Sequence, residues 1–171
     1  MSGATASPLN PLAWLGAPMV LAAVAQLLFA LPLRVFGLQP PEPVFALVPA
    51  FAWAVIRPSV LPPFALLALG LYLDALLGGP LGLWPLCLLA AYAPVLAARR
   101  FLVGQGMIVL WVWYAGACAA ALAVGVVFML MKGGAAPGLV GVALQWLASA
   151  ALFPFAFRLA QRYEDADVRF R

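Results

Sequence analysis

The sequence predicts an all-α membrane protein with about six transmembrane helices, folded as a single integral membrane domain over residues 1–171. Apolar residues make up 67% of the chain and charged residues only 8%, a balance outside the range of soluble globular domains. Apolar stretches near the length that crosses a bilayer, about 20 residues for a hydrocarbon core of roughly 30 Å, recur along nearly the whole chain. Little sequence remains for a separate soluble domain.

The predicted spans can be taken in chain order. The first follows an N-terminus without Lys or Arg and is too long for a signal-peptide core, so we expect an uncleaved helix. The second is short, reaches only about 20 Å as a helix and contains Pro49, which we expect to interrupt it. We expect it either to extend back through Leu38 and Pro41 or to be tilted or partly re-entrant. The fifth is the longest and has room to tilt. The six segments are 14–33, 44–56, 61–77, 81–98, 107–131 and 138–157.

The basic residues predict the orientation, because Lys and Arg in short loops stay on the cytoplasmic side. With the N-terminus in the cytoplasm, only Arg34 and Lys132 lie outside. Both termini are therefore predicted to be cytoplasmic, with residues 158–171 forming a short cytoplasmic tail. The basic residues then placed inside are Arg57, Arg99, Arg100, Arg158, Arg162, Arg169 and Arg171.

The third and fourth segments carry the clearest pattern. Gly70, Asp74 and Gly78 recur every four residues, so they form one stripe of a helix that admits a close neighbour. The connection from Gly78 to Pro80 is so short that it predicts a tight turn between antiparallel helices. Gly82, placed one turn into the fourth helix, is expected to allow a close approach there.

Asp74 is the carboxylate within this apolar region, and three roles remain open for it. It lies beside the turn, where its oxygens can accept hydrogen bonds from the free N–H groups that begin the fourth helix. In that role it fastens a membrane hairpin. Alternatively it binds a partner, or it acts in transport or as a proton relay. The predicted orientation puts it within one turn of the extracytoplasmic end.

No catalytic, cofactor or metal site is predicted. The acidic residues form no general acid and base pair, and the chain has no His to activate Ser59 or Ser149. We expect both hydroxyls to hydrogen-bond their own helix backbone. Cys87 and Cys118 lie in apolar segments and are expected to be buried thiols. No metal-ligand spacing or phosphate loop is found, so the sequence predicts a protein that is not an enzyme.

The remaining polar residues are predicted to contact other helices or lipid headgroups and not to take part in a reaction. Gln26 and Gln145 are expected to hydrogen-bond across helix interfaces. Arg158 and Arg162, one helical turn apart, suit anionic lipid headgroups where the last helix leaves the membrane. The net charge of +4 lies on scattered residues rather than on one basic face, which excludes a nucleic-acid partner.

Two stretches of the chain resemble the rod shape-determining protein MreD family. WAVIRP at 53–58 is similar to the end of that family's second span, and FALLALGLYLDALLGGPLGLWPL at 64–86 is similar to its G-x-x-x-D third span, small-residue turn and following L-G. LFPFAFRLAQRY at 152–163 resembles its last helix, with Pro154 ahead of a basic exit. The other matching positions are Trp53, Arg57, Pro58, Gly70, Asp74, Gly78, Pro80, Leu81 and Gly82.

The resemblance implies a multi-pass scaffold in the bacterial inner membrane, which belongs to the cell-elongation complex and maintains rod shape without being an enzyme. Implied partners are MreC, expected to be contacted directly, and MreB, RodZ, the glycosyltransferase RodA and its transpeptidase partner, besides membrane lipids. It also implies a fold like that of the six-helix substrate-binding components of energy-coupling factor transporters. The alternative function is therefore a small-molecule, vitamin-binding component of such a transporter.

Overall fold

The computed structural model describes residues 12–30, 42–56, 59–133 and 138–168. These residues are helical with short connections and contain no β-strand, so the predicted all-α class is confirmed for them. Five of the six predicted segments each correspond to one α-helix, and the bounds of 61–77 and 107–131 are those of the structure. The elements are a π-helical turn Leu12–Gly16, α1 Ala17–Ala30, α2 Leu47–Ile56, α3 Leu61–Leu77, α4 Leu83–Ala97, α5 Arg99–Leu102, α6 Met107–Met131, α7 Leu139–Ala150 and α8 Phe153–Val168.

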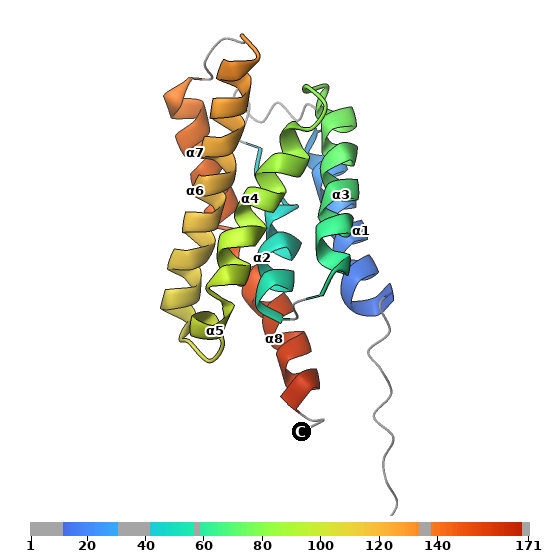
Figure 1. The fold of residues 1–171 in the computed structure, drawn as a ribbon, viewed down its shortest axis with the longest axis vertical. Coiled ribbons are helices and arrows are strands. Elements are labelled where there is room, and N and C mark those ends of the chain that lie inside the picture. The colour runs from blue at the N-terminus through green and yellow to red at the C-terminus, as the bar shows by residue number, and fades with distance from the viewer. Residues whose placement is uncertain (1–11, 31–41, 57–58, 134–137, 169–171) are drawn as a thin grey trace, which may run out of the picture.

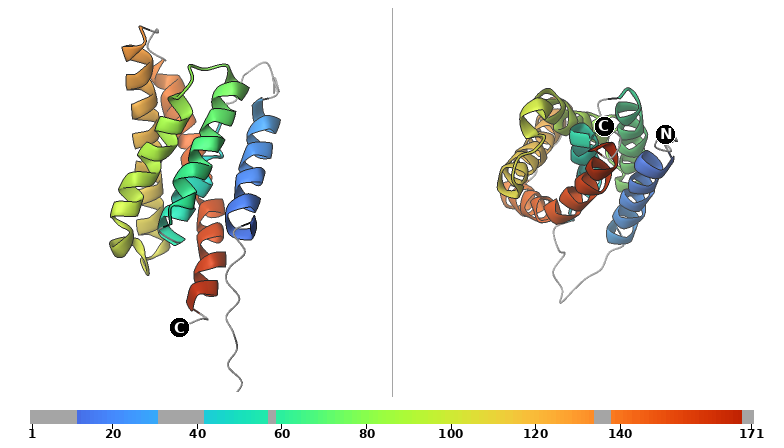
Figure 2. Two further views of the ribbon diagram at one scale, coloured as in Figure 1. Left: turned by 45° about the vertical axis from the view of Figure 1, so that its right-hand side comes forward. Right: turned by 90° about the horizontal axis from the view of Figure 1, so that it is seen from below.

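The helices form a bundle around α2 (Figure 1). α2 packs against α4 and α8 and also contacts α1, α3, α5 and α6. Around it, α3 packs on α4, α4 on α6 and α6 on α7. Seen from below, α2 lies inside the ring of the longer helices, whereas α1 lies at its edge and packs on α3 (Figure 2). A short helix therefore occupies the centre of the bundle.

Burial explains why α2 can be short. It has 10 residues, a length of about 15 Å, and all of them except Val48 and Ile56 are buried. A helix shielded from lipid by other helices need not span the bilayer, because polar backbone beyond a helix end is tolerated where protein encloses it, as at the buried residues Val44 and Ala46 before α2. The expectation that Pro49 interrupts this segment is wrong. Pro49 lies in the first turn of α2, where an N–H has no partner within the helix. The proposed extension through Leu38 lies outside the described residues.

Side chains from distant helices satisfy the backbone at the N-terminal side of α2. The Val44 N–H donates to Ser149 Oγ at 3.0 Å, and the Phe45 N–H donates to Gln26 Oε1 at 3.1 Å. Gln26 thus makes the predicted hydrogen bond between elements. For Ser149 the expectation was wrong: its hydroxyl oxygen accepts from the chain entering α2 rather than bonding its own helix. The reason is that Val44 is buried and non-helical, so its N–H needs an acceptor from elsewhere.

The other end of α2 is capped by an arginine. Arg99, the first residue of α5, donates from Nε to the Val55 carbonyl at 2.7 Å and from Nη2 to the Ile56 carbonyl at 2.9 Å. The last carbonyls of a helix lack partners within it and carry partial negative charge. A guanidinium satisfies two of them at once.

The last predicted segment, 138–157, is two helices rather than one. α7 ends at Ala150 and α8 begins at Phe153, with a turn at 151–152. Pro154 explains the break, because it has no N–H to donate to the carbonyl four residues earlier and its ring would crowd that carbonyl in a continuous helix. The Leu152 N–H donates to the Ser149 carbonyl at 3.0 Å instead. The break thus follows from Pro154.

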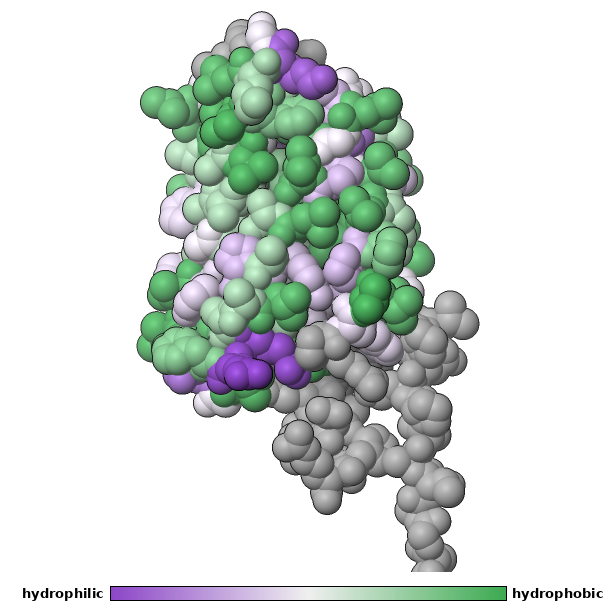
Figure 3. Space-filling model, viewed as in Figure 1, coloured by the Kyte–Doolittle hydropathy of each residue, from purple (hydrophilic) through white to green (hydrophobic). Residues whose placement is uncertain are grey.

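The surface is apolar over the length of the bundle. Figure 3 shows hydrophobic residues over most of one face, with strongly hydrophilic residues gathered at its two ends. By length and composition, α6 and the stretch Leu139–Leu159, which contains the α7–α8 break, can cross a membrane, and four shorter helices are also apolar. Exposed large apolar side chains include Val20, Leu21, Leu28, Phe64, Leu71, Ile108, Val112, Val127, Leu144 and Leu147.

Candidate functional site

Asp74 caps the helix that follows its own. Its Oδ2 accepts a hydrogen bond from the Gly82 N–H at 2.6 Å, and its Oδ1 accepts one from the Trp84 N–H at 2.9 Å. Both hydrogen bonds belong to the first of the three roles left open for Asp74, the fastening of a hairpin. The side chain is only 2% exposed, so these bonds and the positive end of the α4 dipole offset the loss of hydration of the carboxylate. Asp74 therefore joins α3 to α4.

Gly82 serves this cap through its backbone conformation. It is the N-cap of α4 with φ 92°, and it makes no side-chain cap of its own. A Cβ at Gly82 would meet nothing within 4 Å. The expectation that Gly82 lies one turn inside the helix and allows a close approach is therefore wrong. Glycine is favoured there because other residues rarely adopt this φ, and Asp74 supplies the cap that Gly82 lacks.

The turn itself begins at Gly78, which ends α3 in the left-handed conformation with φ 64°. A Cβ at Gly78 would also meet open space. Gly78 thus belongs to the turn rather than to a packed stripe, and the expected stripe is reduced to Gly70 and Asp74. Pro80 follows in the turn, where its carbonyl accepts from the Leu83 N–H at 3.2 Å. The predicted short turn between antiparallel neighbours is present.

Gly70 is where α3 and α4 approach most tightly among the described glycines. A Cβ at Gly70 would lie 2.5 Å from the backbone nitrogen of Pro85 and 2.6 Å from its Cα. No larger residue fits without a shift of the backbone. Gly70 lies one turn before Asp74, so the hairpin is held at two points: a hydrogen-bonded cap and a close backbone contact.

The remaining predicted site residues are placed as follows. Arg57 and Pro58 lie outside the described residues. Pro154 lies in the first turn of α8 and is exposed, away from the α3–α4 turn. Sequence reasoning missed Arg99, whose role as the cap of α2 was not predicted. Its position directly after an apolar segment was visible, but its partners are more than 40 residues away in the chain.

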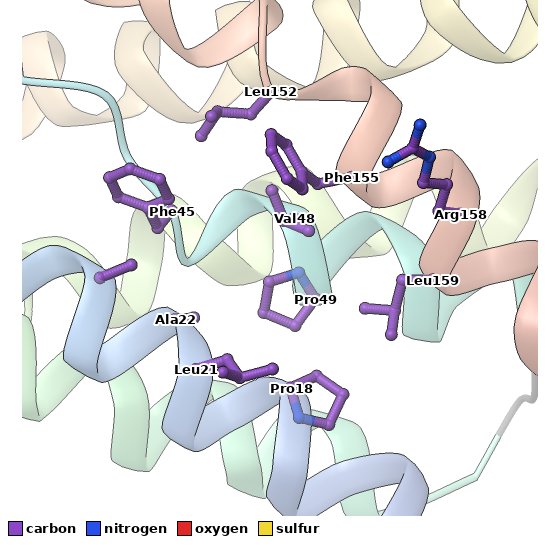
Figure 4. Close-up of a pocket in the computed structure, with 11 residues that line it drawn as sticks. Pro18, Leu21, Ala22, Phe45, Val48, Pro49, Leu152, Phe155, Arg158 and Leu159 are labelled. Carbon is purple, nitrogen blue, oxygen red and sulfur yellow. The ribbon is translucent and has the colours of Figure 1, made fainter.

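A groove opens between α1 and α8, with α2 as its floor (Figure 4). Its volume is about 460 Å³. Pro18, Leu21 and Ala22 of α1 face Phe155 and Arg158 of α8 across it. A smaller cavity of about 120 Å³ lies between α4, α6 and α7 and is lined by Cys87, Gly125 and Gln145, among others. Asp74 lines neither space.

The arrangement favours structure over reaction chemistry at Asp74, because both of its oxygens accept backbone hydrogen bonds. Within the described parts of the chain, no group of three or more His, Cys, Asp or Glu residues is placed to hold a metal ion. No family model, curated protein or solved structure matches this chain.

Proposed function

We propose that this chain is a non-enzymatic scaffold of the bacterial cell-elongation complex, similar in role to the MreD family. In this role it links MreC to the peptidoglycan synthases, RodA and its transpeptidase partner, and works with MreB and RodZ. The proposal rests on the sequence resemblance at 53–58 and 64–86 together with the geometry of the α3–α4 hairpin.

The observation that carries the proposal is that both carboxylate oxygens of Asp74 accept backbone hydrogen bonds. A carboxylate that couples transport or relays protons must exchange protons with water or a solute. Asp74 is buried, and its two oxygens accept from the Gly82 and Trp84 N–H groups. Its position lets it fix the surface that α3 and α4 present together, which is what a docking protein requires. Binding between membrane helices then depends on van der Waals fit.

In the proposed topology the chain crosses the inner membrane about six times, with both termini in the cytoplasm. α5, which contains Arg99 and Arg100, and the C-terminal part of α8 lie toward one end of the bundle, and the α3–α4 turn lies toward the other (Figure 1). This separation supports a cytoplasmic α5 and an extracytoplasmic α3–α4 turn. Reporter fusions to the C-terminus and to the α3–α4 turn should be active on opposite sides of the membrane.

Copurification tests the scaffold function. The tagged full-length chain should bring down MreC from membranes, and its depletion should turn rod-shaped cells round. Asp74→Leu, which removes both acceptors, should weaken MreC recovery, while Arg100→Gln on the exposed side of α5 should leave it unchanged. Normal shape after depletion, with no MreC recovered by the folded wild-type chain, would exclude the proposal.

The volume of the groove between α1 and α8 is compatible with a second candidate, the vitamin-binding component of an energy-coupling factor transporter. A volume of about 460 Å³ lies within the range of small-molecule sites, about 300–1,000 Å³. This candidate requires that the chain copurify with an ATPase module and bind a vitamin tightly in detergent. Recovery of MreC without such a module would decide for the scaffold.

A further inference from the structure

We propose that the groove between α1 and α8 binds a hydrocarbon chain of an anionic phospholipid, with the lipid phosphate at Arg158. This goes beyond the scaffold function and depends only on the protein lying in a membrane. The two proposals can therefore fail separately.

The lining of the groove selects a hydrocarbon chain. Its floor is formed by Val48 and Pro49 of α2, and its walls are apolar side chains of α1 and α8. It follows α8 from Leu152 to Leu159, a distance of about 10 Å at the helical rise. An elongated apolar space of this kind gives a polar solute few hydrogen-bond partners. It suits a chain that lies along the helices.

The groove is open to the side of the bundle. Leu21 at its edge is 69% exposed and Phe155 is 61% exposed. The wall on the α1 side includes Ala22 and Ala25, whose small side chains leave space between α1 and α8. In a membrane, such an opening faces the lipid hydrocarbon, so a lipid chain can enter without crossing water.

Arg158 indicates that the headgroup of the bound lipid is anionic. It is the charged residue among those lining the groove, it is exposed, and Figure 4 places it toward one end of the groove, near Leu159. A long basic side chain near the end of a membrane helix reaches toward the headgroup layer. There the phosphate and net negative charge of an anionic lipid provide a partner.

The same charge argues against a partner helix as the occupant. An apolar transmembrane helix laid along the groove would leave Arg158 without a counter-charge. A partner helix would match this charge only with an acidic residue placed at the level of Arg158, whereas every anionic phospholipid carries its phosphate at the headgroup layer. The observations therefore favour the lipid.

The experiment is native mass spectrometry of the full-length protein, released from detergent after exchange into phosphatidylglycerol or phosphatidylcholine. The wild type should retain one lipid and prefer phosphatidylglycerol. Arg158→Gln should reduce that preference about fivefold, the effect expected of one basic group at an anionic surface. Arg100→Gln, which changes an exposed arginine outside the groove, is the matched control and should have no effect.

A second pair of variants tests the groove itself. Ala22→Phe fills it and should abolish lipid retention, whereas Ala119→Phe adds the same bulk on the exposed side of α6 and should not. Phosphatidylglycerol with a photoreactive acyl chain should label peptides containing residues 18–25 and 152–159 in the wild type. This labelling remains informative if Ala22→Phe fails to fold.

Three results would overturn the proposal. One is labelling spread evenly over the exposed helices, which would show annular lipid only. Another is the same lipid preference in Arg158→Gln and Arg100→Gln. The third is crosslinking of the groove in membranes to a helix of another protein, with no lipid retained by the purified chain.

Discussion

The carboxylate of Asp74 in α3 accepts a hydrogen bond from the backbone N–H of Trp84 in α4, at 2.9 Å and ten residues along the chain. A helix N-cap is ordinarily a side chain of the residue that begins the helix. Here that residue is Gly82, which has no side chain, and the preceding helix provides the acceptor. The cap of one helix thus becomes the link between two.

Asparagine at position 74 should be tolerated better than leucine. Asp74→Asn retains one acceptor oxygen and places an amide NH₂ opposite the second N–H, so it should reduce the free energy of unfolding by about 1–2 kcal/mol. Asp74→Leu leaves both N–H groups without an acceptor and should cost about 3 kcal/mol or more. Thermal unfolding of the purified variants in detergent would measure the difference. If both variants fold stably yet lose MreC binding completely and equally, the negative charge itself is required, as it would be in an ion pair or in the coupling of transport.

Alanine at position 70 should destabilise the hairpin. Gly70→Ala puts a Cβ 2.5 Å from the Pro85 nitrogen, so α3 and α4 must move apart, at a cost of about 1–3 kcal/mol. Gly116→Ala is the matched control, because Gly116 is in α6 with nothing within 4 Å of a Cβ. The control should be neutral or slightly stabilising, since alanine is the better helix former. Melting temperatures in the same detergent compare the two, and equal values would contradict the close contact.

Substitutions of Gly78 should lower the stability according to the backbone conformation that the new residue tolerates and not according to the size of its side chain. Its φ of 64° and the open space around it predict that Gly78→Ala costs about 1–2 kcal/mol through backbone strain alone. Gly78→Asn should cost less despite its larger side chain, because asparagine adopts left-handed geometry more readily. Chemical or thermal unfolding should rank the variants in that order. A greater loss for asparagine would indicate crowding in place of strain.

Arg99 should be more important for stability than Arg100. Arg99→Ala removes the donors to the Val55 and Ile56 carbonyls, and we expect a loss of about 2–3 kcal/mol. Arg99→Lys should recover part of it, because an ammonium cannot reproduce the two-pronged geometry of a guanidinium. Arg100→Ala, on an exposed residue, should change the unfolding free energy by less than about 0.5 kcal/mol. Protease resistance of α2 would give a second measurement, and an equal effect of both alanine variants would contradict the cap.

The hairpin was predictable because its parts are close in sequence. A carboxylate one turn before a Gly-Gly-Pro turn can reach the next helix start, and the hydrogen bonds from Gly82 and Trp84 cross only 8 and 10 residues. The role of Gly82 was misassigned because residue type alone does not distinguish a glycine needed for φ from one needed for space.

The side chains that cap the two ends of α2 could not be predicted from the sequence. Val44 meets Ser149 across 105 residues, and Arg99 meets Val55 across 44. The local sequence pattern of an apolar helix does not indicate which other helix it will pack against, because helices of the membrane type are apolar on nearly all sides. Such partners are selected only when the helices pack.

The sequence by itself determined that the described chain is helical and apolar, and it placed Asp74 beside a tight turn with the capping of the next helix as one of three possible roles, because composition, periodicity and short-range turn geometry act within a few residues. Only the tertiary structure decided that α2 lies at the centre, that Arg99 and Ser149 complete its ends, and that a groove remains between α1 and α8. These features depend on which faces of distant helices meet, and many packings of apolar helices share one hydropathy pattern.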